Sequence, residues 1–168
     1  RFNEVSLPGR HNLSNVMAAA AITLCAGFDV EAIRAGVIGF TGVPHRLETV
    51  GIIGGVRYIN DSIATAPERT LAAVEALSNE SLILLLGGRD KKLPWGKLAE
   101  VLHAKAKAVI TFGEDGSMIA DVVESSLANA GVLTIRRATT MLDALEKSKL
   151  IAAEGDVVVL SPGGTSYD

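Results

Sequence analysis

From Val56 onward, short apolar runs alternate with amphipathic segments along the chain. The runs lie at 56–60, 82–86, 108–112, 132–136 and 157–161, with helical patterns between them near 67–77, 95–106, 115–129 and 139–153. Continuous apolar runs of this length are typical of parallel strands that are covered on both faces. The pattern therefore predicts five parallel strands in a doubly wound α/β domain.

One further strand is predicted at an edge of this sheet. Residues 46–53 read "RLETVGII", and Gly54-Gly55 separates them from the strand at 56–60. A glycine turn between two such segments signals a β-hairpin, so the strand near 47–52 should pair antiparallel. The expected sheet is Rossmann-like and six-stranded, mostly parallel with one antiparallel edge strand.

The first forty residues predict two helices instead. We expect Asn12 to cap the first helix and Gly27 to end it, and Asp29 to cap a second helix over 29–40. The Ala-rich run "VMAAAAITLCAG" suits a buried helix, so Cys25 is expected to be a small core side chain. The pattern changes near Thr41–His45, which divides the chain into a helical part, 1–42, and an α/β domain, 43–168.

The composition of the chain argues against membrane and nucleic-acid partners. With 168 residues, 48% of them hydrophobic, the chain can form one domain, or one domain and a piece of another. No apolar run approaches the roughly 20 residues that span a bilayer, so no membrane partner is expected. A net charge of −3 and only four Phe, two Tyr and one Trp argue against nucleic acid as a partner. The chain begins at Arg rather than Met, so we expect its start to be internal to a longer protein.

Polar residues follow several of the predicted parallel strands. Asn60, Asp61, Ser62 and Thr65 follow the first, "GGRDKK" (87–92) the second and "SPGGTS" (161–166) the last. Ligands bind at this edge of doubly wound sheets, and glycines there let the backbone approach a ligand. Polar turn chemistry could also explain the first group, and a solvated charge run the second. "GEDGS" (113–117) is interpreted as turn punctuation.

Familiar phosphate-binding and metal-binding motifs are missing from the sequence. There is no G-x-x-x-x-G-K-[ST] loop and no G-x-G-x-x-G after a strand, which weakens any argument for dinucleotide binding from the fold alone. His11, His45 and His103 fall in three different elements, so no metal-ligand spacing is present. No Ser-His-Asp ordering suggests a hydrolase.

Five motifs, in order, resemble those of the Mur ligases. They are "LPGRHNLSN" (7–15), "VPHRLE" (43–48), "INDSIAT" (59–65), "LLLGGRDK" (84–91) and "LSPGGTSYD" (160–168). Branches of the family that add other amino acids typically carry an aromatic and His-Pro signature where this chain has Asn60-Asp61-Ser62. The resemblance therefore favours the branch that adds D-glutamate.

The resemblance implies a three-domain, ATP-dependent ligase of bacterial peptidoglycan precursor synthesis, cytoplasmic and monomeric. Residues 1–42 would be the helical tail of its central ATP-binding domain, and 43–168 its C-terminal amino-acid-binding domain. ATP would phosphorylate the carboxylate of UDP-N-acetylmuramoyl-L-alanine, and D-glutamate would attack the acyl phosphate. The phosphate loop and the carbamylated lysine that holds Mg²⁺ would lie upstream. No catalytic or metal-binding residue is therefore expected here, and the isolated chain should be inactive.

The resemblance also assigns nucleotide-binding residues. Asn12 and Asn15 would line the adenine side of the ATP site, Arg46 would reach the phosphates, and Asp61 would lie near the ribose. The residue types are suitable, because a guanidinium binds phosphate oxygens bidentately and a carboxylate accepts hydrogen bonds from ribose hydroxyls.

Thr65, Lys91 and Ser166 resemble the residues that hold the carboxylates of D-glutamate. A cation flanked by two hydroxyl donors is what a dicarboxylate requires. The chain departs from many relatives in two places: Ile63 stands where they have lysine, and Gly163-Gly164-Thr165 where they often have Ala-Cys-Ala.

Two other functions stay open from the sequence. A folylpolyglutamate synthetase, or a Mur ligase that adds another amino acid, would share the fold. A nucleotide- or amino-acid-binding module without catalysis is the alternative from a different class.

Overall fold

A computed structural model describes residues 4–5, 7, 9–89, 91–126 and 133–165. The chain divides into two compact units, Arg1–Pro44 and His45–Asp168. No helix among the described residues is both long enough and apolar enough to cross a bilayer.

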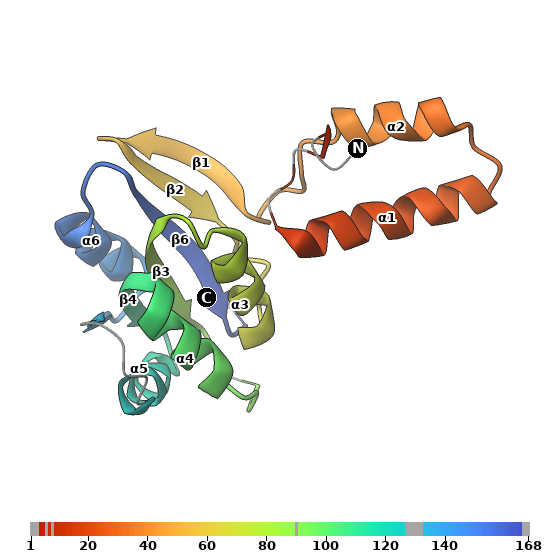
Figure 1. Cartoon of the computed structure of the whole chain (residues 1–168). Helices are drawn as coiled ribbons and strands as arrows, with labels where there is room; N and C mark the ends of the chain where they lie inside the picture. The colour runs from red at the N-terminus through yellow and green to blue at the C-terminus, as the bar shows by residue number, and fades with distance from the viewer. Residues whose placement is uncertain (1–3, 6, 8, 90, 127–132, 166–168) are drawn as a thin grey trace. The chain divides into compact units, whose positions relative to one another are not determined.

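The first unit is built on two helices, α1 (Arg10–Cys25) and α2 (Val30–Gly39), drawn red to orange in Figure 1. Gly27 takes a φ of 86° after α1 and donates its N–H to Leu24 O at 2.9 Å, while Phe28 N donates to Thr23 O at 3.1 Å. This pair of bonds is the Schellman motif, which glycine favours. The prediction that Gly27 ends the first helix is confirmed.

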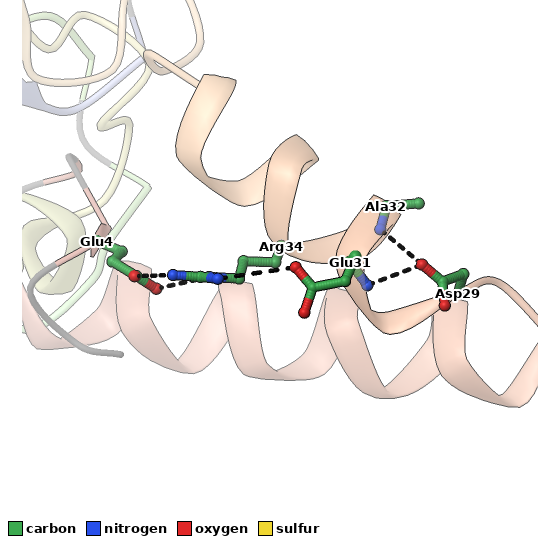
Figure 2. Close-up of polar contacts among 5 residues, drawn as sticks. All are labelled: Glu4, Asp29, Glu31, Ala32 and Arg34. Atoms are coloured by element: carbon green, nitrogen blue, oxygen red, sulfur yellow. Dashed lines mark hydrogen bonds and ion pairs between the residues drawn. The ribbon is translucent and has the colours of Figure 1, made fainter.

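Asp29 caps α2, as predicted. Its carboxylate accepts hydrogen bonds from the backbone N–H groups of Glu31, at 3.0 Å, and Ala32, at 3.2 Å (Figure 2). In the same view Arg34 binds both carboxylate oxygens of Glu4, and these hydrogen bonds hold the pKa of Glu4 at about 2. The segment before α1 is thereby tied to α2.

Two predictions in this unit are wrong. Asn12 does not cap α1, because Gly9, with a φ of 89°, takes the N-cap position and the helix begins at Arg10. Cys25 is exposed rather than part of a core. The reason is that two helices alone cannot cover every apolar side chain, and Met17 and Ile22 are exposed as well.

The second unit contains the predicted sheet. Its strand order is β1-β2-β6-β3-β4-β5, and β1 is antiparallel to β2 while the other neighbouring pairs are parallel. The strands are β1 (Glu48–Ile53), β2 (Val56–Asn60), β3 (Ser81–Gly87), β4 (Ala106–Phe112), β5 (Thr134–Arg137) and β6 (Asp156–Gly163). The helices are α3 (Pro67–Ala76), α4 (Gly96–Lys105), α5 (Gly116–Ser125) and α6 (Met141–Ile151). The predicted six-stranded, mostly parallel α/β fold is confirmed.

The helices cover the two faces unequally (Figure 1). Val74, Leu102 and Ile119, from α3, α4 and α5, pack in one core with alternate strand residues, whereas Ala144 from α6 belongs to a second core with the others. From β3 the chain continues through β4 to β5, which is an edge strand of the sheet. It then passes through α6, and β6 lies between β2 and β3. The carboxyl ends of these three strands are therefore neighbours.

Candidate functional site

Three loops meet at the carboxyl ends of β2, β3 and β6. Gly163 N donates to Ala64 O at 2.8 Å, which joins the last residue of β6 to the loop after β2. Arg89 and Thr165 form an antiparallel bridge, with N–H···O distances of 2.8 and 2.9 Å, which joins the loop after β6 to the loop after β3. The polar groups noticed in the sequence thus share one rim, which we call the β2–β6–β3 rim.

Glycines let these backbones approach one another. A Cβ on Gly88, whose φ is 89°, would lie 2.5 Å from Thr165 O. A Cβ on Gly164 would lie 2.7 Å from Gly87 O. Neither distance is possible for a real side chain, so the glycines after β3 and within the β6 loop are required by the packing of the rim.

Two of the predicted D-glutamate residues lie together on this rim. Lys91 Nζ donates to Thr65 O at 3.2 Å and lies 3.4 Å from Thr65 Oγ1. Lys91 is exposed and Thr65 is half-buried, so an ammonium and a hydroxyl are presented side by side. Ser166, the third predicted residue, lies outside the described residues.

Asp61 is buried behind the rim. Its Oδ2 accepts a hydrogen bond from Ser161 Oγ at 2.8 Å, and its Oδ1 accepts from Leu47 N at 3.1 Å. Thr70, on α3, joins this cluster by donating to Ser161 O at 3.1 Å. A buried carboxylate requires such donors, and here they come from two separate segments of the chain, β6 and the turn before β1.

Arg46 is exposed on a turn with unusual backbone geometry. The residues on either side, His45 and Leu47, have φ values of 66° and 47°, in the left-handed region that side chains other than glycine rarely adopt. The turn is held by the bond from Leu47 N to Asp61 and by Asn60 Nδ2, which donates to His45 Nδ1 at 2.9 Å. Strain of this kind persists only where the surroundings fix it, and it concentrates at functional sites.

The remaining predicted nucleotide residues belong to the first unit. Asn12 is buried and Asn15 is exposed, both on α1. A spacing of three places them on the same side of the helix. The seven predicted residues are thus divided between the two compact units, two in the first and five in the second.

Two residues of the rim were not predicted from the sequence. Thr70 and Arg69 both lie in the first turn of α3, and Arg69 Nη1 donates to Ile63 O at 3.3 Å. The only signal for them in the sequence is their place directly after the polar segment that follows β2. Which of the side chains in that turn face back toward the rim depends on how α3 is rotated.

The comparison with protein families covers this same unit. A model described as "Mur ligase, glutamate ligase domain" matches residues 45–164. The chain belongs to the Mur ligase family. The Mur ligase resemblance carried by the five sequence motifs is therefore confirmed.

Curated relatives point to one branch of the Mur ligases. UDP-N-acetylmuramoylalanine--D-glutamate ligase of Symbiobacterium thermophilum is 40% identical to this chain over 167 residues. The alignment covers 99% of this chain but 36% of that protein. This chain thus spans about a third of the length of its Mur ligase relatives.

Solved Mur ligase structures share the fold. UDP-N-acetylmuramate-alanine ligase MurC from Thermotoga maritima has a TM-score of 0.73 at 20% identity, covering 96% of this chain and 36% of that one. MurF ligase from Thermotoga maritima in complex with ADP has a TM-score of 0.67 at 16% identity, covering 90% of this chain and 34% of that one. At these identities the likeness concerns the fold of a Mur ligase alone.

Proposed function

We propose that this chain is part of an ATP-dependent ligase that joins D-glutamate to UDP-N-acetylmuramoyl-L-alanine in peptidoglycan precursor synthesis. The observation that carries the proposal is the Lys91–Thr65 pair on the β2–β6–β3 rim, within a glutamate ligase domain. The 40% identity with a ligase named for D-glutamate supports the same substrate.

On the amino-acid side, Lys91 is proposed to bind a carboxylate of D-glutamate. The ammonium has three donors, and its contacts to Thr65 leave it exposed on one side. A charge-assisted hydrogen bond to a carboxylate is stronger than a bond to a carbonyl, so the ligand can be held without displacing the loop. Ser166 is proposed as a second hydroxyl donor.

On the nucleotide side, Arg46 is proposed to contact the ATP phosphates. Asp61 is proposed to lie near the ribose but to act mainly by fixing the Arg46 turn, since its two oxygens already accept from Leu47 and Ser161. Asn12 and Asn15 are proposed for the adenine side. ATP, when bound, would supply the phosphoryl group that activates the acceptor carboxylate.

Magnesium is also part of the proposal. The described residues contain no group of three His, Cys, Asp or Glu side chains that could hold a metal ion. As the family resemblance implies, the Mg²⁺ ligands are proposed to lie in another part of the full-length protein, and this chain is proposed to bind nucleotide and amino acid.

The test is an amide-formation assay on the full-length protein that contains this chain. With ATP, Mg²⁺ and UDP-N-acetylmuramoyl-L-alanine present, we expect product and stoichiometric phosphate release with D-glutamate, and neither with L-glutamate or L-lysine. Faster reaction with another amino acid, or L-glutamate addition to a folate, would contradict the proposed substrate. Ligand binding without phosphate release would indicate a module without catalysis.

A further inference from the structure

Two cations bind the same short turn on the β2–β6–β3 rim. Lys91 Nζ donates to Thr65 O at 3.2 Å, and Arg69 Nη1 donates to Ile63 O at 3.3 Å. The turn is tight, since Thr65 N itself donates to Ile63 O at 2.9 Å. A lysine from the loop after β3 and an arginine from the first turn of α3 therefore converge on carbonyls only two residues apart.

The turn itself is well fixed. The carbonyl between these two, that of Ala64, accepts from Gly163 N at 2.8 Å. Three consecutive carbonyls thus receive hydrogen bonds from α3, from the end of β6 and from the loop after β3. A ligand bound by the two cations would meet a preformed arrangement, which lowers the entropic cost of binding.

Neither cation is neutralised by the described part of the protein. Several other basic side chains of this unit form ion pairs with carboxylates, such as Arg57 with Glu80 at 2.7 Å and Arg137 with Asp121 at 2.7 Å. Among the described residues, the side chains of Arg69 and Lys91 donate hydrogen bonds only to this turn, and a carbonyl does not cancel a full charge. A guanidinium has five donors, so one bond to Ile63 O leaves most of them available.

The surroundings of the turn favour an anion with more than one charge. The side chain of Ile63 is 44% exposed and apolar, so it brings no charge of its own. α3 begins at Pro67 without a side-chain cap, and its N-terminus adds partial positive charge. Glu68 is the one acidic side chain in the first turn of α3, and no ion pair joins it to Arg69.

We propose that Arg69 is the second cation of the amino-acid site and pairs with one carboxylate of D-glutamate while Lys91 pairs with the other. The inference rests on the proposed function, because it takes a dicarboxylic amino acid as the ligand. A single ammonium with its hydroxyl neighbours satisfies one carboxylate, and the second carboxylate requires a partner of its own when it leaves water. Arg69 supplies that partner.

The experiment is steady-state kinetics of Arg69→Gln in the full-length ligase. We expect the KM for D-glutamate to rise at least about tenfold, as for the loss of a charge-assisted bond, while the KM for ATP stays within about threefold. Arg69→Lys, which keeps a charge, should recover part of the loss. Arg136→Gln is the matched control, because Arg136 is an exposed arginine whose Nη1 also binds a backbone carbonyl, at 3.1 Å, but on β5; it should leave both constants unchanged.

A second readout identifies the carboxylate. D-glutamine lacks the γ-carboxylate and D-isoglutamine lacks the α-carboxylate, and their inhibition constants can be measured with both enzymes. For one of these two amides Arg69→Gln should change the inhibition constant by less than about twofold, since the charge that Arg69 would bind is already absent. Equal losses for D-glutamate and both amides would mean a general disturbance of the rim and would overturn the proposal.

The kinetic result also separates this inference from the proposed function. A KM for D-glutamate that stays within about twofold in Arg69→Gln but rises in Lys91→Ala would overturn the role of Arg69 alone. An unchanged KM in both variants would remove the D-glutamate site from this turn altogether.

Discussion

The carboxylate of Asp61 is buried, and two different segments of the chain donate hydrogen bonds to it. Ser161 Oγ lies 2.8 Å from one oxygen and Leu47 N lies 3.1 Å from the other. A buried charge is tolerated only with such bonds, and removing one partner leaves the cost of desolvation unbalanced. Asp61 thus links the Arg46 turn to the end of β6.

Removing the hydroxyl of Ser161 should therefore destabilise the protein. We expect Ser161→Ala to lower the free energy of unfolding by about 1–3 kcal/mol, because an oxygen of Asp61 loses its donor inside the protein. Urea unfolding followed by circular dichroism measures this. Ser117→Ala, at an exposed position on α5, is the control and should change the free energy by less than about 0.5 kcal/mol. Equal effects of the two substitutions would show that the buried bond has no special weight.

At the residue scale, the sequence predicted which residue types gather on the rim but not all of their contacts. The Lys91–Thr65 contact pairs two residues that were both predicted for the amino acid. Thr70 and Arg69 could not be predicted, because the direction of a side chain in the first turn of a helix depends on how that helix packs. Asn12 was misplaced because its preference for N-cap positions was outweighed by the backbone freedom of Gly9.

At the element scale, the continuous apolar runs predicted the five parallel strands, and the glycine turn at Gly54-Gly55 predicted the antiparallel edge strand. The ends were less well predicted: β5 ends at Arg137 rather than at 136, and α5 ends at Ser125. The predicted helix end near 129 and the predicted strand start at 132 lie outside the described residues. The strand order could not be predicted from the hydrophobic pattern, because the position of β6 between β2 and β3 depends on how the helices and strands pack. The Ala-rich run in α1 likewise predicted a buried helix, but the run does not indicate which other element would cover that helix.

The loops after β3 and β6 approach each other so closely that a side chain at Gly88 should not fit between them. Gly88→Ala would place a Cβ 2.5 Å from Thr165 O at a φ of 89°. We expect a loss of at least about 2 kcal/mol of stability, from overpacking together with left-handed strain. Thermal and urea unfolding measure the loss.

The control for this substitution is Gly51→Ala in β1. A Cβ at Gly51 would meet nothing within 4 Å, and its φ is not positive. Its stability should stay within about 0.5 kcal/mol of the parent protein. If Gly88→Ala were as harmless as Gly51→Ala, the loops would not be packed as described.

At the scale of the whole molecule, the chain consists of two compact units, and the predicted functional residues are divided between them. Asn12 and Asn15 are in the first unit, whereas Arg46, Asp61 and the Lys91–Thr65 pair are in the second. The second unit matches the glutamate ligase domain of the Mur ligases. On the rim of that unit, we propose that Arg46 binds the nucleotide and that Lys91 binds the amino acid.

The most direct test compares Lys91→Ala with Arg46→Ala in the full-length enzyme. For Lys91→Ala we predict a KM for D-glutamate raised by about 10- to 150-fold, as expected for about 1.5–3 kcal/mol of lost charge-assisted bonding, with the KM for ATP within about threefold. Arg46→Ala should show the opposite pattern, because its guanidinium would lose phosphate contacts. If the two variants raised the same constant, or if Lys91→Ala chiefly weakened ATP, the assignment of the two sides of the rim would be contradicted.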